Sequence, residues 1–198
     1  NGLEGESGKY IHNLWLTVLR NVCTRSNAQN PQEIIFHNAY LFLPSNMLKL
    51  IGHMVDGQMD CRHVHVRVIT NSPETTDLNV INLAARYSTK ALLNYYQQYR
   101  APERAATFSY YEYKSPEEGS GRADRSLHSK VMVFGPDMFI GSANTDVRSY
   151  MMDSNNGLYI QNAPELVSSY KAWVTELIKD PQQITNKTGY LAGTTFER

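Results

Sequence analysis

The sequence predicts an α/β fold in which a mixed, largely parallel sheet is flanked by helices on both faces. Strand-like segments alternate with amphipathic helical segments along most of the 198 residues, which is the pattern of an open α/β sheet. Hydrophobic residues make up 41% and charged residues 19% of the chain, as is typical of a globular protein. We expect one domain over residues 9–180, between a flexible end at 1–8 and a polar tail at 181–198.

The first third of the chain contains two helical and two strand-like segments. Apolar residues recur at helical spacing over 9–24 and predict an amphipathic helix. β-Branched and aromatic residues over 33–43 predict a buried strand, which a proline ends. Ser45 is a suitable N-cap for a helix that runs to about residue 59. Alternating apolar residues over 63–70 then predict a second strand.

A long helix and a further strand follow a break at Asn71-Ser72-Pro73. Apolar positions over residues 77–99 predict the helix. Aromatic residues over 107–113 predict the strand, and the polar, glycine-bearing segment 115–124 reads as a loop. Two interpretations stay open for Asn71 and Ser72, which either approach a functional site or serve the entry to this helix.

The last part of the chain predicts three short strands and one helix. The apolar runs 126–134 and 138–141 indicate two of the strands, and residues 157–160 indicate the third. Apolar residues at helical spacing over 164–179 predict the helix, which begins at a proline.

Composition and charge disfavour two classes of protein. Lys plus Arg and Asp plus Glu number 19 each, so the net charge is zero with histidine neutral. Because phosphate neutralisation supplies much of the affinity for nucleic acid, a dedicated binder usually carries a basic excess. No run approaches the roughly 20 apolar residues of a membrane span. The sequence leaves the compartment open.

The cysteines and a histidine pair do not indicate a metal site. Cys23 and Cys61 are too far apart for a CxxC motif, and they either pair or stay free. His63 and His65 share one strand face, but no third ligand stands at a suitable spacing. We therefore expect no metal.

The segment from Leu127 to Asn144 carries the residues best suited to chemistry. On a strand, His128 and Lys130 point the same way. Burying an unpaired ammonium is costly, so Lys130 should have an anionic partner or ligand. Ser142 and Asn144 follow a short strand, on a turn that can return them to the same edge. Imidazole, ammonium, hydroxyl and amide groups together suit a phosphate group, because histidine can attack phosphorus or move a proton while the others stabilise charge on oxygen.

Structural interpretations of these residues also stay open. His128 can be a hydrogen-bonded strand histidine beside a lysine whose stem lies on apolar surface. Ser142 and Asn144 are common turn residues. Arg148 can contact phosphate or form an ion pair within the fold.

These residues resemble the HxK…GSxN motif of the phospholipase D superfamily. The run from Asn144 to Ser149 is similar to the N-x-D-x-R-S run of the bacterial phospholipase D and cardiolipin synthase branch. Residues 66–72, with Thr76-Asp77, are similar to that branch's strand followed by TNS…TD. The resemblance covers roughly residues 33–180 and identifies a phospholipase D-like catalytic domain over 9–180.

The resemblance implies a mechanism that needs no metal or other cofactor and uses two histidines, one from each of two motif copies. One attacks the phosphodiester to give a phosphohistidine; the other protonates the leaving alcohol and later activates water or an acceptor alcohol. His128, Lys130, Ser142 and Asn144 match the motif position by position. Only one copy is present, and TNS…TD identifies the C-terminal half, where His128 would be the acid/base histidine. A second motif-bearing half is then expected in cis or in a homodimer.

Two positions depart from the family pattern. The motif has an Asp five residues after the Lys, where this chain has Gly135, and Asp137 lies two residues further on. The branch also tends to carry a Glu about 27 residues after the histidine, where this chain has Asn155; Asp153 lies two residues earlier. An amide can hold a histidine tautomer but stabilises imidazolium less well than a carboxylate does. We take Asp137 and Asn155, with Ser142 and Arg148, as candidates for phosphate binding or support.

The resemblance predicts hydrolysis or phosphatidyl transfer on phospholipids at a membrane surface, by a bacterial protein that is peripheral to the membrane. Two alternatives are kept. A homodimeric nuclease of this superfamily fits the size of the chain, but the neutral charge makes nucleic acid the less favoured substrate. A catalytically weakened module that binds a phosphate-bearing ligand or a partner would account for Gly135 and Asn155.

Overall fold

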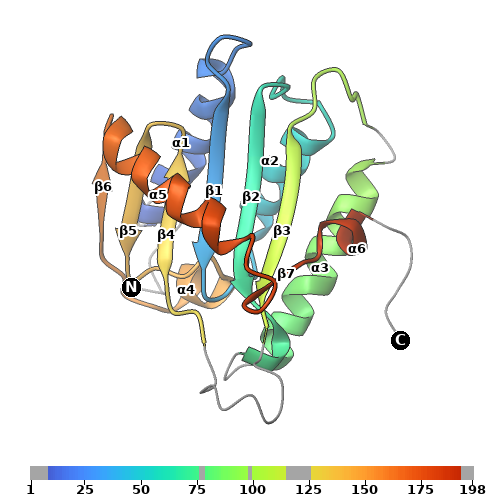
Figure 1. Ribbon diagram of the computed structural model, residues 1–198, viewed down its shortest axis with the longest axis vertical. Coiled ribbons are helices and arrows are strands. Elements are labelled where there is room, and N and C mark those ends of the chain that lie inside the picture. Colours follow the sequence, from blue (N-terminus) through green and yellow to red (C-terminus); the bar gives the residue numbers. More distant parts are fainter. Residues whose placement is uncertain (1–8, 76–78, 98–99, 115–125, 193–198) are drawn as a thin grey trace.

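The computed structural model describes residues 9–75, 79–97, 100–114 and 126–192. In this part of the chain, one seven-stranded sheet has the strand order β6-β5-β4-β1-β2-β3-β7 (Figure 1). Its strands are β1 (Gln32–Asn38), β2 (Val64–Asn71), β3 (Thr107–Tyr113), β4 (Lys130–Phe134), β5 (Asp137–Gly141), β6 (Gly157–Ile160) and β7 (Ile184–Asn186). The helices are α1 (Tyr10–Arg25), α2 (Ser45–Val55), the 3-10 turn η2 (Pro73–Thr75), α3 (Asn79–Gln97), α4 (Val147–Met151), α5 (Pro164–Leu177) and α6 (Thr188–Ala192).

The sheet is mixed, as predicted, but antiparallel pairs outnumber parallel ones. β1, β2 and β3 run parallel to one another. The pairs β1–β4, β4–β5, β5–β6 and β3–β7 are antiparallel. Parallel strands need a long crossover, which only α2 and α3 supply, whereas a short turn joins β4 to β5. The α/β class is therefore confirmed, and the expectation of a largely parallel sheet is corrected.

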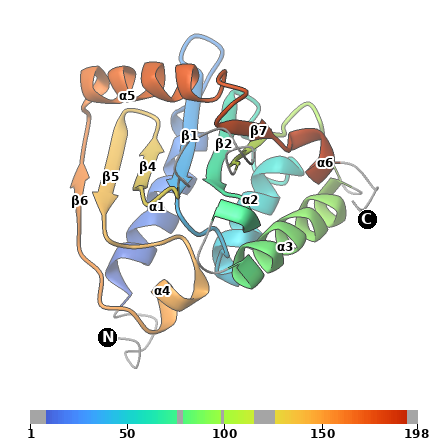
Figure 2. The same ribbon diagram turned by 60° about the horizontal axis from the view of Figure 1, so that its bottom comes forward.

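Helices cover both faces of the sheet (Figure 2). On one face, Leu19 of α1 and Met54 of α2 pack against Phe36 of β1 in the larger core cluster. On the other face, Val174 of α5 packs against Ile35 in a smaller cluster. The alternation of side chains along a strand thus sends neighbouring residues of β1 to different helical layers. None of the helices in the described residues is long and apolar enough to cross a membrane.

Two strands on either side of the candidate site are shorter than predicted. β1 ends at Asn38 rather than at residue 43, and β4 begins at Lys130 rather than at 126. After β1, the backbone pairs with a different segment: Tyr40 O accepts from Thr145 Oγ1 at 3.1 Å, and Phe42 O accepts from Val147 N at 2.8 Å. The apolar run continues past β1 because this segment is buried, although it is not a strand.

The predicted polar tail at 181–198 is wrong in its described part. β7 pairs with β3, and α6 places Leu191, which is fully buried, in the core. Three strand residues and one helical turn are too short to show a periodic pattern. The predicted flexible end at 1–8, residues 193–198 and the predicted loop at 115–124 lie outside the described residues.

Cys23 and Cys61 form a disulfide, which decides between the two states that the sequence left open. Cys23 lies near the end of α1, and Cys61 lies three residues before β2. The bridge therefore ties α1 to the amino-terminal end of a central strand. That end of β2 is opposite the edge where the motif residues gather.

Candidate functional site

The motif residues gather at one edge of the sheet, where the carboxyl ends of β1 and β2 meet the beginning of β4 and the end of β5. Asn38, the last residue of β1, pairs with Lys130, the first residue of β4. Opposed residues of an antiparallel pair point to the same face. Because Phe36 and Met132 of these strands lie in the core beneath α1 and α2, Lys130 and Asn38 face that same side.

His128 lies two residues before β4 and is exposed to solvent. The pairing of the two chain segments continues to this point, since Ala39 N donates to Ser129 O at 3.0 Å. His128 and Lys130 therefore share one face, as predicted from strand alternation. Lys130 Nζ donates to His128 O at 3.0 Å, which brings the ammonium to the backbone of the histidine. The exposed imidazole is open to a group that approaches the edge from outside.

The carboxylate whose charge acts on Lys130 is that of Asp146. Burial lowers the pKa of Lys130, and the negative charge of Asp146 opposes this shift. Asp146 is itself buried and caps α4, where its side chain accepts from Ser149 N at 2.5 Å. Burial raises the pKa of the Asp146 carboxyl. The site thus contains a half-buried ammonium supported by one carboxylate, next to an exposed imidazole.

Ser142, Asn144 and Asn155 are brought together through Ser149, which the sequence did not single out. Asn144 N donates to Ser149 Oγ at 3.1 Å, and Asn155 Nδ2 donates to the same oxygen at 2.8 Å. Ser142 Oγ is 3.4 Å from Asn155 Oδ1. Asn144 Oδ1 is buried and has no hydrogen-bond partner among the described residues. The turn after β5 and the segment before β6 therefore form one polar cluster.

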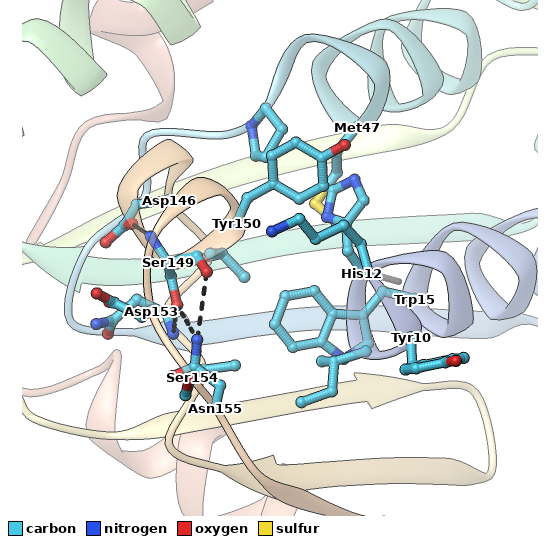
Figure 3. Close-up of a pocket in the computed structure, with 16 residues that line it drawn as sticks. Tyr10, His12, Trp15, Met47, Asp146, Ser149, Tyr150, Asp153, Ser154 and Asn155 are labelled. Atoms are coloured by element: carbon cyan, nitrogen blue, oxygen red, sulfur yellow. Dashed lines mark hydrogen bonds between the residues drawn. The ribbon is translucent and has the colours of Figure 1, made fainter. Parts of the chain in front are cut away.

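A pocket of about 240 Å³ adjoins this cluster between α1, α2 and α4 (Figure 3). Trp15 and Tyr150 supply aromatic lining, and Ser149 and Asn155 lie across the pocket from Trp15. Asn144 also lines the pocket. His128 and Lys130 are not among the residues that line it. The pocket thus meets the motif only through the turn that carries Asn144.

Asp137 does not join the site, although the sequence made it a candidate. It pairs with Phe134 at the far end of the β4–β5 hairpin, four residues along β4 from Lys130. Its buried carboxylate accepts from Tyr159 Oη at 2.8 Å and forms an ion pair with Arg25 at 3.2 Å. Asp137 therefore fastens α1 and β6 to this hairpin. Only its distance along the strand, and not its residue type, excludes it from the phosphate-binding candidates.

Gly135 shows why the family's Asp is absent at this position. The residue has φ of 65°, and an added Cβ would lie 2.2 Å from Gln32 Oε1. Both features disfavour a side chain. The tight turn between β4 and β5 therefore favours glycine at this position.

Arg148 forms an ion pair rather than joining the polar cluster. Its Nε is 3.6 Å from Asp153 Oδ1, and its side chain is 65% exposed. Of the two interpretations left open by the sequence, the ion pair within the fold is the one observed. An exposed guanidinium at this edge also stays accessible to an approaching anion.

Two buried asparagines beside the motif were not among the site residues predicted from the sequence. Asn38 and Asn71 end β1 and β2, and their side-chain amides bond to the backbone around the motif residues. The sequence feature that could have identified them is an asparagine at the end of an apolar strand. Such an amide is expected to be buried and therefore to need hydrogen-bond partners. For Asn71 the sequence left two interpretations, and the observed contacts agree with both. Its amide bonds to Leu127 beside the motif and to Thr75 of the turn before α3.

His65 has a structural explanation. Its Nδ1 lies 2.7 Å from Thr107 Oγ1, and its Nε2 lies 2.8 Å from Ser109 Oγ. Within the described ranges, no group of three or more His, Cys, Asp or Glu residues is arranged to hold a metal ion.

The side chains at this edge are of types that can act on a phosphate group. An imidazole can exchange a proton with an oxygen or attack phosphorus. An adjacent ammonium and a side-chain amide can stabilise the negative charge that develops on phosphate oxygens.

Comparison with known proteins identifies related domains. The family model described as "Cardiolipin synthase, PLD-like domain" matches residues 25–178. A search of the curated proteins returns no match.

Three solved structures have a similar fold. Phosphatidylserine synthase from Haemophilus influenzae Rd KW20 has a TM-score of 0.64 and 12% identity, over 92% of this chain and 38% of that chain. NucT from Helicobacter pylori has a TM-score of 0.55 and 13% identity, over 87% and 91%. Nuc from Salmonella typhimurium, a phospholipase D family member, has a TM-score of 0.50 and 16% identity, over 87% and 89%. At these identities the likeness establishes the fold alone.

Proposed function

Because the chain belongs to the family of cardiolipin synthase, PLD-like domains, we propose that it catalyses phosphodiester hydrolysis or phosphatidyl transfer on phospholipids. The superfamily predicted from the HxK…GSxN motif is confirmed by this membership. The observation that carries the proposal is the exposed imidazole of His128, with the Lys130 ammonium beside it and Asn144 on the neighbouring turn. The reaction would take place at a membrane surface.

The proposed reaction has two steps and conserves protons. In the first, a histidine of the second motif attacks phosphorus, the bond to the leaving alcohol breaks, and protonated His128 gives its proton to that alcohol oxygen. In the second, His128 takes a proton from water or an acceptor alcohol, whose oxygen attacks phosphorus and breaks the bond to the nucleophilic histidine. Lys130 and Asn144 stabilise charge on the phosphate oxygens in both steps.

A second motif-bearing half is part of the proposal. The sequence has one copy of the motif, and His128 is exposed at an open edge where a second copy can approach. The chain spans 38% of the phosphatidylserine synthase chain but about nine tenths of the NucT and Nuc chains. The second half can therefore lie in the same polypeptide or in a second copy of this chain.

A second candidate function is cleavage of nucleic acid by a homodimer, the alternative kept from the sequence, and the chain is close in length to NucT and Nuc, of which it covers 91% and 89%. The net charge of zero argues against it, because it leaves no general basic excess to bind phosphates. A third candidate function is a module that binds a phosphate-bearing ligand without turnover, and Asn155 is the residue that favours it. Its amide bonds to Ser149 and does not supply the charge that a Glu would bring to an imidazolium.

The deciding experiment measures turnover of phosphatidylglycerol and phosphatidylcholine by the protein that carries this chain, with plasmid cleavage assayed in parallel. We expect His128→Ala to lower lipid turnover about a thousandfold or more, as for the loss of a group that takes part in bond breaking. His65→Ala is the matched control, because it removes a histidine at the opposite end of the sheet and should leave turnover near wild type.

Three results would contradict the proposal in different ways. Plasmid cleavage that requires His128, without lipid turnover, would establish the nuclease. Binding of a phosphate-bearing lipid without turnover of either substrate would establish the binding module. Full lipid turnover in a folded His128→Ala variant would remove the histidine from the chemistry.

A further inference from the structure

Two buried asparagines end neighbouring parallel strands next to the motif. Asn38 is the last residue of β1 and is 0% exposed, and Asn71 is the last residue of β2 and is 2% exposed. A buried side-chain amide is stable only where its donors and acceptor find partners. Here most of these partners are backbone atoms of the two segments that carry the motif.

The amide of Asn71 pairs with the backbone of Leu127, the residue before His128. Leu127 N donates to Asn71 Oδ1 at 2.8 Å, and Asn71 Nδ2 donates to Leu127 O at 2.9 Å. Because a backbone N–H can only donate and a backbone carbonyl can only accept, Leu127 identifies which end of the amide is the oxygen. Thr75 Oγ1 lies 3.2 Å from the same Oδ1. The Asn71 side chain thus makes the two backbone hydrogen bonds at Leu127 that a neighbouring strand would otherwise make.

The residue after His128 is held by the same group of contacts. Asn71 Nδ2 also donates to Ala39 O at 3.2 Å, and Ala39 N donates to Ser129 O at 3.0 Å. The backbone on both sides of His128 is therefore fixed, although the imidazole is exposed. The contacts leave the histidine free mainly to rotate about its own side-chain bonds.

Asn38 holds the second motif segment in the same manner. Its Nδ2 donates to Ala143 O at 3.3 Å, and Thr145 N donates to its Oδ1 at 3.3 Å. Ala143 and Thr145 flank Asn144. Because Asn38 is also opposite Lys130 in the sheet, its amide connects the strand that carries the ammonium with the turn that carries the motif amide.

We infer that Asn71 and Asn38 are positioning residues, of which the first holds His128 and the second holds Asn144 in the geometry that phosphodiester chemistry needs. The inference rests on the proposed function for its reaction, but its contacts can be tested without turnover. A displacement of about 1 Å can lower the rate of a reaction about a hundredfold. Neither amide is exposed to substrate, so their loss should act on kcat and not on KM.

The kinetic test compares Asn71→Ala with Val174→Ala, a substitution at a buried residue of α5 on the opposite face of the sheet. Both should lower stability, but only the first releases Leu127. We expect kcat for phospholipid turnover to fall about a hundredfold in Asn71→Ala, with KM within about twofold of wild type. In Val174→Ala, kcat should stay near wild type at temperatures where the variant is folded.

A milder variant keeps the inference testable if Asn71→Ala does not fold. Thr75→Val retains the asparagine and removes the hydroxyl that orients its amide. Its expected loss of kcat is about fivefold, as for one neutral hydrogen bond. A wild-type kcat in folded Asn71→Ala or Thr75→Val, or a loss no greater than that in Val174→Ala, would overturn the inference.

Amide hydrogen exchange and the NMR signals of the imidazole give a readout that needs no turnover. We expect the Leu127 amide to be protected in the wild type and to lose protection in Asn71→Ala, while Ile35 in mid-β1 keeps it. The His128 ring signals should broaden in Asn71→Ala but not in Asn38→Ala, which should instead shift the side-chain signals of Asn144. Unchanged exchange and signals would overturn the inference. A wild type without lipid turnover would contradict only the proposed function.

Discussion

The charge of Lys130 is the residue-scale feature on which the proposed chemistry depends. Its ammonium is half-buried at the edge of the sheet, where burial lowers its pKa and the carboxylate of Asp146 opposes that shift. Asp146 also caps α4, so one side chain both begins the helix and supports the ammonium. The ammonium must stay protonated to stabilise phosphate oxygens.

The prediction at this scale concerns Asp146→Asn. The amide keeps the cap on α4 but removes the charge, so the pKa of Lys130 should fall further and the alkaline limb of kcat should move to lower pH. NMR titration of the Lys130 side chain and a kcat–pH profile measure the two effects. Asp153→Asn is the control. It also removes a negative charge near α4, but that charge pairs with Arg148. Equal shifts in both variants would show that Asp146 has no particular role.

At the scale of elements, the contact between α5 and the sheet is centred on His37 of β1. The imidazole is 1% exposed, its Nδ1 lies 2.5 Å from Tyr170 Oη, and its ring stacks at 6.3 Å from that of Tyr113. Trp173 completes the aromatic contact from α5. Burial lowers the pKa of His37 to about 4. A neutral imidazole is therefore part of this helix–sheet interface.

This burial predicts an acid-sensitive contribution to stability. The folded-state pKa of His37 lies below the ordinary histidine pKa of 6.5, so between about pH 6.5 and pH 4 the unfolded chain binds more protons. The contribution is present above pH 6.5 and is lost as the pH falls through about 4. Its full size is about 3 kcal/mol. Urea unfolding at several pH values should show His37→Phe to be less pH-dependent than wild type over this range, and a His37 titration near 6.5 would refute the prediction.

At the scale of the whole molecule, one disulfide connects two elements that the sheet does not join. Cys23 of α1 and Cys61 before β2 are 38 residues apart, so the bridge closes a loop of that length. Closing such a loop restricts the unfolded chain.

Removing this disulfide should destabilise the fold without changing the chemistry. The double variant Cys23→Ala, Cys61→Ala should lose about 3 to 4 kcal/mol of unfolding free energy. Its kcat should match wild type where both are folded, because the bridge is at the edge opposite the site. Urea unfolding with and without a reductant measures the effect. A reductant that leaves the wild-type midpoint unchanged, although the bridge is shown to be reduced, would contradict it.

Periodic pattern was a reliable guide where an element was long or uniformly apolar. The strand at 107–113 and the start of α5 at residue 164 agree with the structure, because aromatic content and helical spacing are local properties. Elements whose stability comes from distant partners were missed or misjudged. β7 depends on its pairing with β3, and the end of β1 depends on backbone contacts between residues 40–42 and 145–147.

The candidate site was likewise predicted only in part. The motif placed His128, Lys130, Ser142 and Asn144 at one edge, and the structure brings these segments together. Asp137 was misassigned because residue type gives no distance along a strand. Strand position alone separates it from Lys130.

The α/β class, the superfamily and the residues of the motif could be predicted from the sequence, because these depend on periodicity and on spacing within short segments. The folded structure was needed to show that Asn71 and Asn38 hold the backbone around the motif, that the charge of Asp146 acts on Lys130 and that Cys23 pairs with Cys61. Each of these is a contact between residues far apart in the chain. Such contacts form only when packing of the sheet and its helices brings the partners within hydrogen-bonding, electrostatic or bonding distance.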